Sequence, residues 1–123
     1  MITDNKVILI VDDELDILEL LRNFLKKAGY RAMTASSGRV ALEKAKEHPD
    51  LILLDIVMPG GLDGYEVLSR LKCGLATKNI PVIMLTAKSE SASIFKAQNL
   101  DVTDYIIKPC NPSELLKVVK KYI

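Results

Sequence analysis

The stretch Val7-Ile8-Leu9-Ile10-Val11-Asp12-Asp13 joins five consecutive apolar residues to two aspartates. A short, continuously apolar and β-branched run is typical of a strand that other elements cover on both faces. The period then changes, because Leu18, Leu21 and Leu25 recur at helical spacing and Gly29 follows as a helix-terminating residue. This stretch therefore predicts a strand at residues 6–11 and an amphipathic helix at residues 14–28, with two carboxylates at their junction.

The same alternation of strand and helix continues along the chain. Capping and helix-breaking residues separate the segments, since Ser36-Ser37 precede the second predicted helix, Pro49 follows it, and Asn111-Pro112 open the last one. We expect further strands at residues 31–35, 51–54, 81–85 and 105–107, and further helices at residues 38–47, 65–72, 89–98 and from residue 112 onward. Five successive strand–helix units predict a doubly wound α/β fold, (βα)5, with helices on both faces of a parallel sheet.

Length and composition indicate one globular domain over residues 1–123. Apolar residues make up 49% of the chain and charged residues 27%, which excludes intrinsic disorder. The apolar runs are far shorter than the roughly 20 residues that span a bilayer, so we expect no membrane association. The N-terminus lacks the basic region of a signal peptide, and Cys73 and Cys110 do not indicate a disulfide framework. These features predict a cytoplasmic protein.

The charge balance excludes one class of partner. Lys and Arg number 17 and Asp and Glu number 16, which gives a formal net charge of +1. Direct nucleic-acid binding generally requires a basic excess or a basic stripe, so we expect none. The sequence has a single histidine, His48, so multi-histidine metal sites are excluded, as are histidine-based triads. We expect His48 at the surface.

Chemically reactive side chains gather where the predicted strands end. Asp12 and Asp13 follow the first strand, Asp55 the third, Thr86 the fourth and Lys108 the fifth. In a doubly wound sheet the carboxyl ends of the strands share the edge at which ligands bind. Two carboxylates about 5 Å apart repel each other by roughly 3 kcal/mol, and a hard divalent cation with oxygen ligands offsets that repulsion. The sequence therefore predicts a Mg²⁺ site at this edge.

These groups suit phosphoryl chemistry. A carboxylate beside Mg²⁺, an ammonium group and a hydroxyl is equipped to attack phosphorus and become an acyl phosphate. Asp55 is the expected nucleophile, because it is alone at the end of its strand, whereas Asp12 and Asp13 are the expected metal ligands. Lys108 and the metal would stabilise charge on the phosphoryl oxygens. In the simpler alternative, Asp12 and Asp13 only cap the following helix, which leaves one of them and Asp55 unexplained.

Five sequence blocks resemble the receiver domain of two-component response regulators. The blocks are VILIVDDE at residues 7–14, LLDIVMP at 53–59, DGYE at 63–66, PVIMLTA at 81–87 and DYIIKP at 104–109. They occur in the family's order and at its spacing over essentially the whole chain. The resemblance implies a flavodoxin-like three-layer sandwich whose five-stranded parallel sheet has the order 2-1-3-4-5.

The resemblance also implies roles for the residues at the strand ends. Asp55 would accept a phosphoryl group from a histidine kinase or a phosphotransfer protein in a Mg²⁺-dependent reaction, and Lys108 would pair with that group. Four groups would surround the metal: the side chains of Asp12, Asp13 and Asp55 and the backbone carbonyl of Val57.

Two further residues would transmit the modification. Thr86 would move to bond a phosphoryl oxygen while Tyr105 turns inward, so that new charge at one point biases a two-state domain. The output would be a downstream protein or effector domain, reached through the face of residues 89–98, residues 105–107 and the last helix, which is also where a phosphorylation-dependent dimer would form. The domain would not act as an enzyme on other substrates. It would be either a stand-alone receiver or the N-terminal part of a longer regulator.

The sequence departs from the family pattern at four places. Gly60-Gly61-Leu62 adds one residue to the loop beside the site, which could alter access. Asp101-Val102 stand where Gly-Ala is usual, so we expect a local backbone change there. Cys110 replaces a common Phe. Val57 cannot orient an attacking water, and we therefore expect a slowly hydrolysed phosphoryl group.

Three rival functions follow from the same residues. A metal-dependent phosphohydrolase generally needs a second carboxylate two residues after the nucleophile, where this chain has Val57. A nucleotide- or flavin-binding protein of this architecture would carry a glycine-rich phosphate loop after a strand, and the sequence has none. A scaffold that keeps the fold but takes no phosphate would have no reason to retain Asp55, Thr86 and Lys108.

Overall fold

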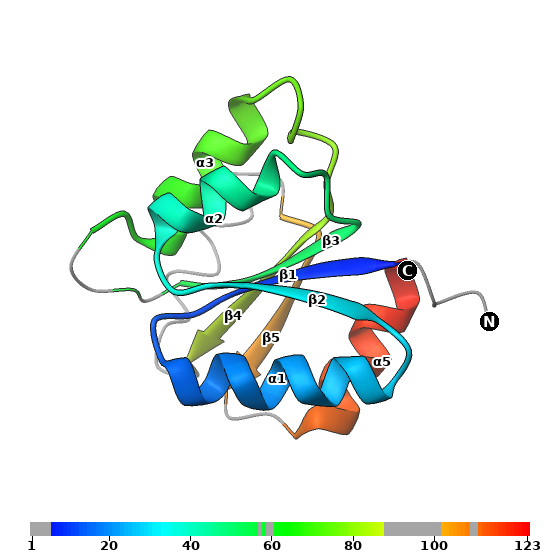
Figure 1. The fold of residues 1–123 in the computed structure, drawn as a ribbon. Coiled ribbons are helices and arrows are strands. Elements are labelled where there is room, and N and C mark those ends of the chain that lie inside the picture. Colours follow the sequence, from blue (N-terminus) through cyan, green and yellow to red (C-terminus); the bar gives the residue numbers. More distant parts are fainter. Residues whose placement is uncertain (1–5, 57, 59–60, 88–101, 109–110) are drawn as a thin grey trace.

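The computed structural model describes residues 6–56, 58, 61–87, 102–108 and 111–123 (Figure 1). Five parallel strands form one sheet in the order β2-β1-β3-β4-β5. The strands are β1 (Val7–Val11), β2 (Arg31–Ala35), β3 (Leu51–Asp55), β4 (Val82–Ala87) and β5 (Asp104–Lys108). The helices are α1 (Leu15–Lys27), α2 (Gly38–Ala45), α3 (Gly64–Cys73) and α5 (Pro112–Tyr122). The predicted α/β fold and strand order are confirmed, with small differences at element ends. The helix predicted at residues 89–98 lies outside the described residues.

Helices cover both faces of the sheet, α1 and α5 on one side and α2 and α3 on the other (Figure 1). Successive strand residues alternate between two apolar clusters, one on each face of the sheet. In β1, Ile8 and Ile10 belong to the cluster on the α1/α5 side, whereas Leu9 and Val11 belong to the cluster on the α2/α3 side. Because both faces are buried, an uninterrupted apolar run is what the central strands require. Among the described helices, none combines the length and the apolar character needed to cross a bilayer.

Local capping signals fix where the helices begin and end. Asn111 caps α5 reciprocally, since its Oδ1 accepts from the backbone N of Glu114 at 2.9 Å and its Nδ2 donates to the Glu114 carboxylate at 2.9 Å. Ser37 and Asp63 each accept one backbone N–H at the start of α2 and α3. Gly29 has a φ of 99°, which lets the chain reverse after α1.

The strand order decides where the site lies. From β1 the chain moves to β2 on one side of the sheet and then to β3 on the other, so that the direction of winding changes between β1 and β3. Val11 and Leu54 are paired in register at the carboxyl ends of these two strands. The residues that follow them, Asp12 and Asp55, are therefore brought together at the point where doubly wound sheets bind ligands.

In the core on the α1/α5 side, the hydroxyl of Tyr30 is a buried polar group without a hydrogen-bond partner among the described residues. The Tyr30 side chain is 2% exposed, and burial raises its pKa. A buried hydroxyl without a partner costs free energy. Tyr30→Phe is therefore expected to raise the free energy of unfolding by about 1 kcal/mol in urea titrations at neutral pH.

Tyr122→Phe is the matched control for this prediction. The Tyr122 hydroxyl donates to Asp104 Oδ2 at 2.7 Å, so its removal is expected to lower stability. A loss of stability in Tyr30→Phe comparable to that in Tyr122→Phe would contradict the assignment of Tyr30 as an unsatisfied group.

Candidate functional site

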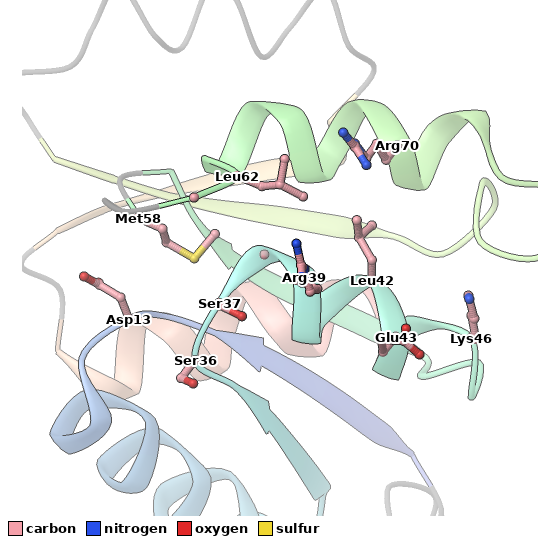
Figure 2. Close-up of a pocket in the computed structure, with 12 residues that line it drawn as sticks. Asp13, Ser36, Ser37, Arg39, Leu42, Glu43, Lys46, Met58, Leu62 and Arg70 are labelled. Atoms are coloured by element: carbon pink, nitrogen blue, oxygen red, sulfur yellow. The ribbon is translucent and has the colours of Figure 1, made fainter.

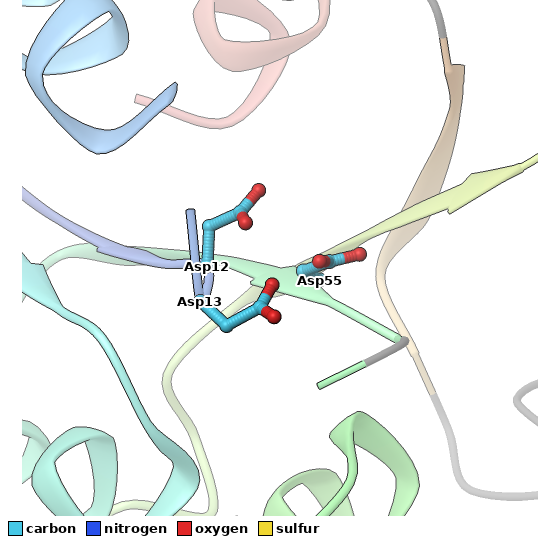
Figure 3. A group of neighbouring side chains, drawn as sticks. All are labelled: Asp12, Asp13 and Asp55. Carbon is cyan, nitrogen blue, oxygen red and sulfur yellow. The ribbon is translucent and has the colours of Figure 1, made fainter. Parts of the chain in front are cut away.

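Three carboxylates converge at the carboxyl edge of the sheet (Figure 3). Asp12 and Asp13 follow β1, and Asp55 ends β3. One carboxylate oxygen from each lies within 4.8 Å of the others. Asp12 is fully buried and Asp55 is 7% exposed, whereas Asp13 is exposed to solvent. The predicted meeting of these residues at one edge is confirmed, and their oxygens form a donor set that suits a hard divalent cation such as Mg²⁺.

The turn after β1 gives Asp12 and Asp13 different surroundings. The backbone N of Asp12 continues the sheet by donating to the carbonyl of Ala35 at 3.1 Å. Its carboxylate Oδ1 accepts from the backbone N of Glu14 at 2.9 Å, which holds the side chain over the strand end. Glu14 is the N-cap residue of α1, and its own side chain makes no capping hydrogen bond. Asp12 also contacts the Lys108 ammonium group, so the alternative in which Asp12 and Asp13 merely cap the helix leaves this contact unexplained.

Asp55 is positioned by a close approach between a strand and a helix. The backbone N of Ile56 donates to the carbonyl of Leu85 in β4, and the N of Gly64 at the start of α3 donates to the carbonyl of Ile56 at 2.9 Å. A Cβ on Gly64 would lie 2.4 Å from the Asp55 carbonyl oxygen and 2.6 Å from the Ile56 Cα. Only glycine permits this contact. Sequence reasoning missed this role, because it depends on the packing of α3 against the end of β3.

Lys108 joins the acidic cluster from the end of β5. Its Nζ lies 3.1 Å from Asp12 Oδ2 and 3.3 Å from Asp55 Oδ1, and its side chain is 30% exposed. Burial is the largest single influence and lowers the pKa of Lys108, but its charge interactions and hydrogen bonds with Asp55 and Asp12 outweigh burial and raise the pKa above its ordinary value. The ammonium group therefore bridges two buried carboxylates and offsets their repulsion.

The two residues assigned to a switch lie on adjacent strands. Thr86 in β4 is buried and is paired in register with Ile107 of β5. Tyr105 in β5 is half-buried, and burial, followed by Tyr65 and Asp104, raises its pKa. The structure thus places Thr86 on the strand next to Asp55 and Tyr105 one strand further out, while their movement stays a prediction.

Several sequence predictions concern positions outside the described residues. These are the metal-ligand carbonyl and apolar side chain of Val57, the backbone change at Asp101, Cys110, and the first part of the added loop at Gly60. The second part is described: Leu62 packs against the core on the α2/α3 side. His48 is exposed, as predicted. Cys73 is an exposed free cysteine.

Helix α1 carries two exposed leucines, one of which lies beside the charged site. Leu15 is 70% exposed and Leu20 is 58% exposed. A pocket of about 240 Å³ is lined by Leu20 and Lys108, among other residues of α1, β4 and α5. Leu15 and Leu20 are five positions apart and face different directions, but Leu20 belongs to an apolar pocket beside the reactive edge that another protein can cover.

Comparison with known proteins gives a consistent result. The family model described as "Response regulator receiver domain" matches residues 8–120. The chain is 44% identical over 117 residues to the alkaline phosphatase synthesis transcriptional regulatory protein PhoP of Bacillus subtilis, covering 94% of this chain and 48% of PhoP. It is 41% identical over 120 residues to sporulation initiation phosphotransferase F of the same organism, covering 97% of this chain and 94% of that protein.

Solved structures agree with the sequence relatives. Chemotaxis protein CheY4 of Vibrio cholerae superposes with a TM-score of 0.89 at 31% identity, over 96% of this chain and 98% of that chain. The chain thus spans about half of PhoP but nearly all of phosphotransferase F and CheY4. The match covers the described strand ends that carry Asp12, Asp55 and Lys108.

Proposed function

We infer the function from one premise: this chain belongs to the response regulator receiver domain family, whose model covers residues 8–120. We propose that Asp55 accepts a phosphoryl group from a histidine kinase or a phosphotransfer protein in a Mg²⁺-dependent reaction. The phosphorylated domain then changes conformation and regulates a partner protein or an attached effector domain. The observation that carries the proposal is the meeting of Asp12, Asp13 and Asp55 with Lys108 at one edge of the sheet.

The proposed reaction follows from the charges at the site. A carboxylate oxygen of Asp55 forms a bond to phosphorus while the bond from phosphorus to the donor's imidazole nitrogen breaks, and the imidazole leaves with the electron pair and takes up a proton. Asp12, Asp13 and Asp55 would hold the metal. When bound, Mg²⁺ supplies positive charge that offsets the repulsion between these carboxylates and the incoming phosphoryl oxygens. Lys108, already 3.3 Å from Asp55, places its ammonium group to stabilise the product.

Two surface features support a protein as the source and the target of the signal. The exposed apolar side chain of Leu20 lines a pocket together with Lys108, at the side of the site where a donor protein would have to dock to reach Asp55. On β5, Ile107 is 48% exposed in the strand that also holds Tyr105 and Lys108. We propose that movement of Thr86 and Tyr105 changes this second surface and so alters binding of the downstream partner or a second copy of the chain.

The test is the intact mass of the protein after incubation with acetyl phosphate, with and without Mg²⁺. The wild type is expected to gain the mass of one phosphoryl group only when Mg²⁺ is present, and Asp55→Asn is expected to gain none. Asp63→Asn is the matched control, because asparagine also caps a helix and Asp63 lies outside the acidic cluster.

Two outcomes would contradict the proposal. A folded wild type that binds Mg²⁺ and gains no phosphoryl group would make the domain a scaffold. Steady turnover of a generic phosphate monoester would instead make it a phosphohydrolase, whereas we propose that it acts only on its own Asp55.

A further inference from the structure

A second cavity, which adjoins the acidic cluster, opens between α2 and α3 (Figure 2). Its volume is about 490 Å³, within the range of roughly 300–1,000 Å³ typical of sites for small organic ligands. Asp13 lies at one end of it, so the cavity borders the acidic cluster. The chemistry proposed for Asp55 uses none of its other lining residues.

Five charged side chains line the cavity: Arg39, Lys46 and Arg70 are positive and Asp13 and Glu43 are negative, so the lining has a formal net charge of +1. Arg39 lies on α2, Lys46 directly follows α2, and Arg70 lies on α3. All three side chains are exposed, and none forms an ion pair with another described residue. Glu43 also lines the cavity and likewise makes no ion pair within the described part of the chain. Two guanidinium groups on facing helices present planar donors that match the oxygens of a phosphate or a carboxylate.

The inner wall of the cavity is apolar. Met58 is buried, and the half-buried Leu42 on α2 and Leu62 before α3 also line the cavity (Figure 2). Gly38 brings the start of α2 close to this wall, since a Cβ on Gly38 would lie 2.8 Å from the Leu62 Cβ. Leu62 belongs to the loop for which the sequence predicts one residue more than the family pattern.

We propose that this cavity binds a small organic anion. Arg39 and Arg70 would hold a phosphate or carboxylate head group, and the apolar part of the ligand would pack against Leu42 and Leu62. The excess of one positive charge in the lining favours an anion over a neutral molecule, and the apolar wall favours an organic anion over an inorganic one. Binding at this site does not depend on phosphorylation of Asp55, and a negative result at one site leaves the other unaffected.

The experiment is a titration with phenyl phosphate in buffer without divalent metal, followed by NMR shifts of backbone amides and leucine methyl groups. Saturable shifts are expected at Leu42 and Leu62. The double variant Arg39→Gln/Arg70→Gln is expected to weaken binding at least about tenfold. Arg31→Gln, which removes an exposed arginine on β2 away from the cavity, is the matched control and is expected to bind like the wild type.

Two further measurements separate the parts of the proposal. Leu42→Ala keeps every charge and is expected to weaken phenyl phosphate binding about fivefold through lost apolar contact. Inorganic phosphate and phenol, which each match half of the cavity, are expected to bind at least about tenfold more weakly than phenyl phosphate. The proposal is overturned if shifts at Leu42 and Leu62 do not saturate, if the double arginine variant binds as well as the wild type, or if inorganic phosphate alone binds equally well.

Discussion

Lys108→Met is expected to lower the free energy of unfolding by about 2–4 kcal/mol in metal-free buffer at neutral pH. The substitution removes the cation that bridges Asp12 and Asp55 and leaves two buried carboxylates within 4.8 Å of each other. Removing one partner of a fully buried ion pair costs roughly 3–5 kcal/mol. The loss expected here is smaller, because the Lys108 side chain is 30% exposed and solvent screens part of its charge. Urea titrations of the two proteins in EDTA measure this difference.

Added Mg²⁺ is expected to restore most of this stability. A divalent cation bound by the same carboxylates replaces the missing positive charge, and in the variant it no longer competes with an ammonium group for their oxygens. The stabilisation by Mg²⁺ should therefore be larger in Lys108→Met than in the wild type. Lys117→Met, an exposed lysine on α5, is the matched control. An equal loss in both variants, or a Lys108→Met protein that Mg²⁺ does not stabilise, would contradict the assigned role.

The pH dependence has a defined sign. The pKa of Lys108 lies above its ordinary 10.5 in the folded protein, because the ion pairs with Asp55 and Asp12 outweigh burial. A group with a raised folded-state pKa contributes stability that is fully present below its unfolded pKa and is lost as the pH rises through the folded value. The stability difference between wild type and Lys108→Met should therefore be constant near neutral pH and narrow as the pH increases beyond 10.5.

Gly64→Ala is expected to destabilise the protein by about 1–3 kcal/mol and to slow phosphorylation of Asp55. The new Cβ would meet backbone atoms of Asp55 and Ile56 at 2.4 and 2.6 Å, and neither atom can move without displacing the end of β3. Relief of the clash requires α3 to shift away from the strand or Asp55 to leave its place in the cluster. Denaturant titration and the rate of adduct formation with acetyl phosphate measure the two effects.

Gly61→Ala provides a control in the same loop region. A Cβ on Gly61 would meet no atom within 4 Å, so alanine is expected to be tolerated. Its effect should be neutral or slightly stabilising, because alanine restricts the unfolded chain more than glycine does. If Gly61→Ala slowed phosphorylation as much as Gly64→Ala, the loss could not be assigned to the contact of α3 with β3.

The features that could be predicted from the sequence are those that short stretches encode. The run from Val7 to Val11 identifies a buried strand without reference to the strands that pair with it. Asn111 signals the start of a helix through its side chain, and Gly29 signals the end of one through its backbone freedom. The meeting of Asp12 with Asp55 followed from topology alone, because parallel strands expose their carboxyl ends at one edge. These predictions are confirmed by the strand order and by the distances in the cluster.

The remaining features depend on contacts between distant segments. Asp12 and Asp13 are adjacent and identical in chemistry, yet one is fully buried and hydrogen-bonded to Glu14 while the other is exposed, because the turn after β1 directs them differently. The need for glycine at position 64 arises only once α3 packs against β3. The cavity between Arg39 and Arg70 is likewise a product of helix packing, which no local pattern encodes.

The bridge between Lys108 and Asp12 joins residues separated by 96 positions in the chain. Such a contact forms only after a large loop has closed, and closing that loop costs conformational entropy early in folding. Contacts between residues so far apart in the chain also raise the contact order of the native state. A chain still emerging from the ribosome, before residue 108 has been made, holds Asp12 and Asp55 without the cation that accompanies them in the finished domain. Completion of the charged site therefore coincides with completion of the sheet, and a partly folded chain lacks a competent receiver site.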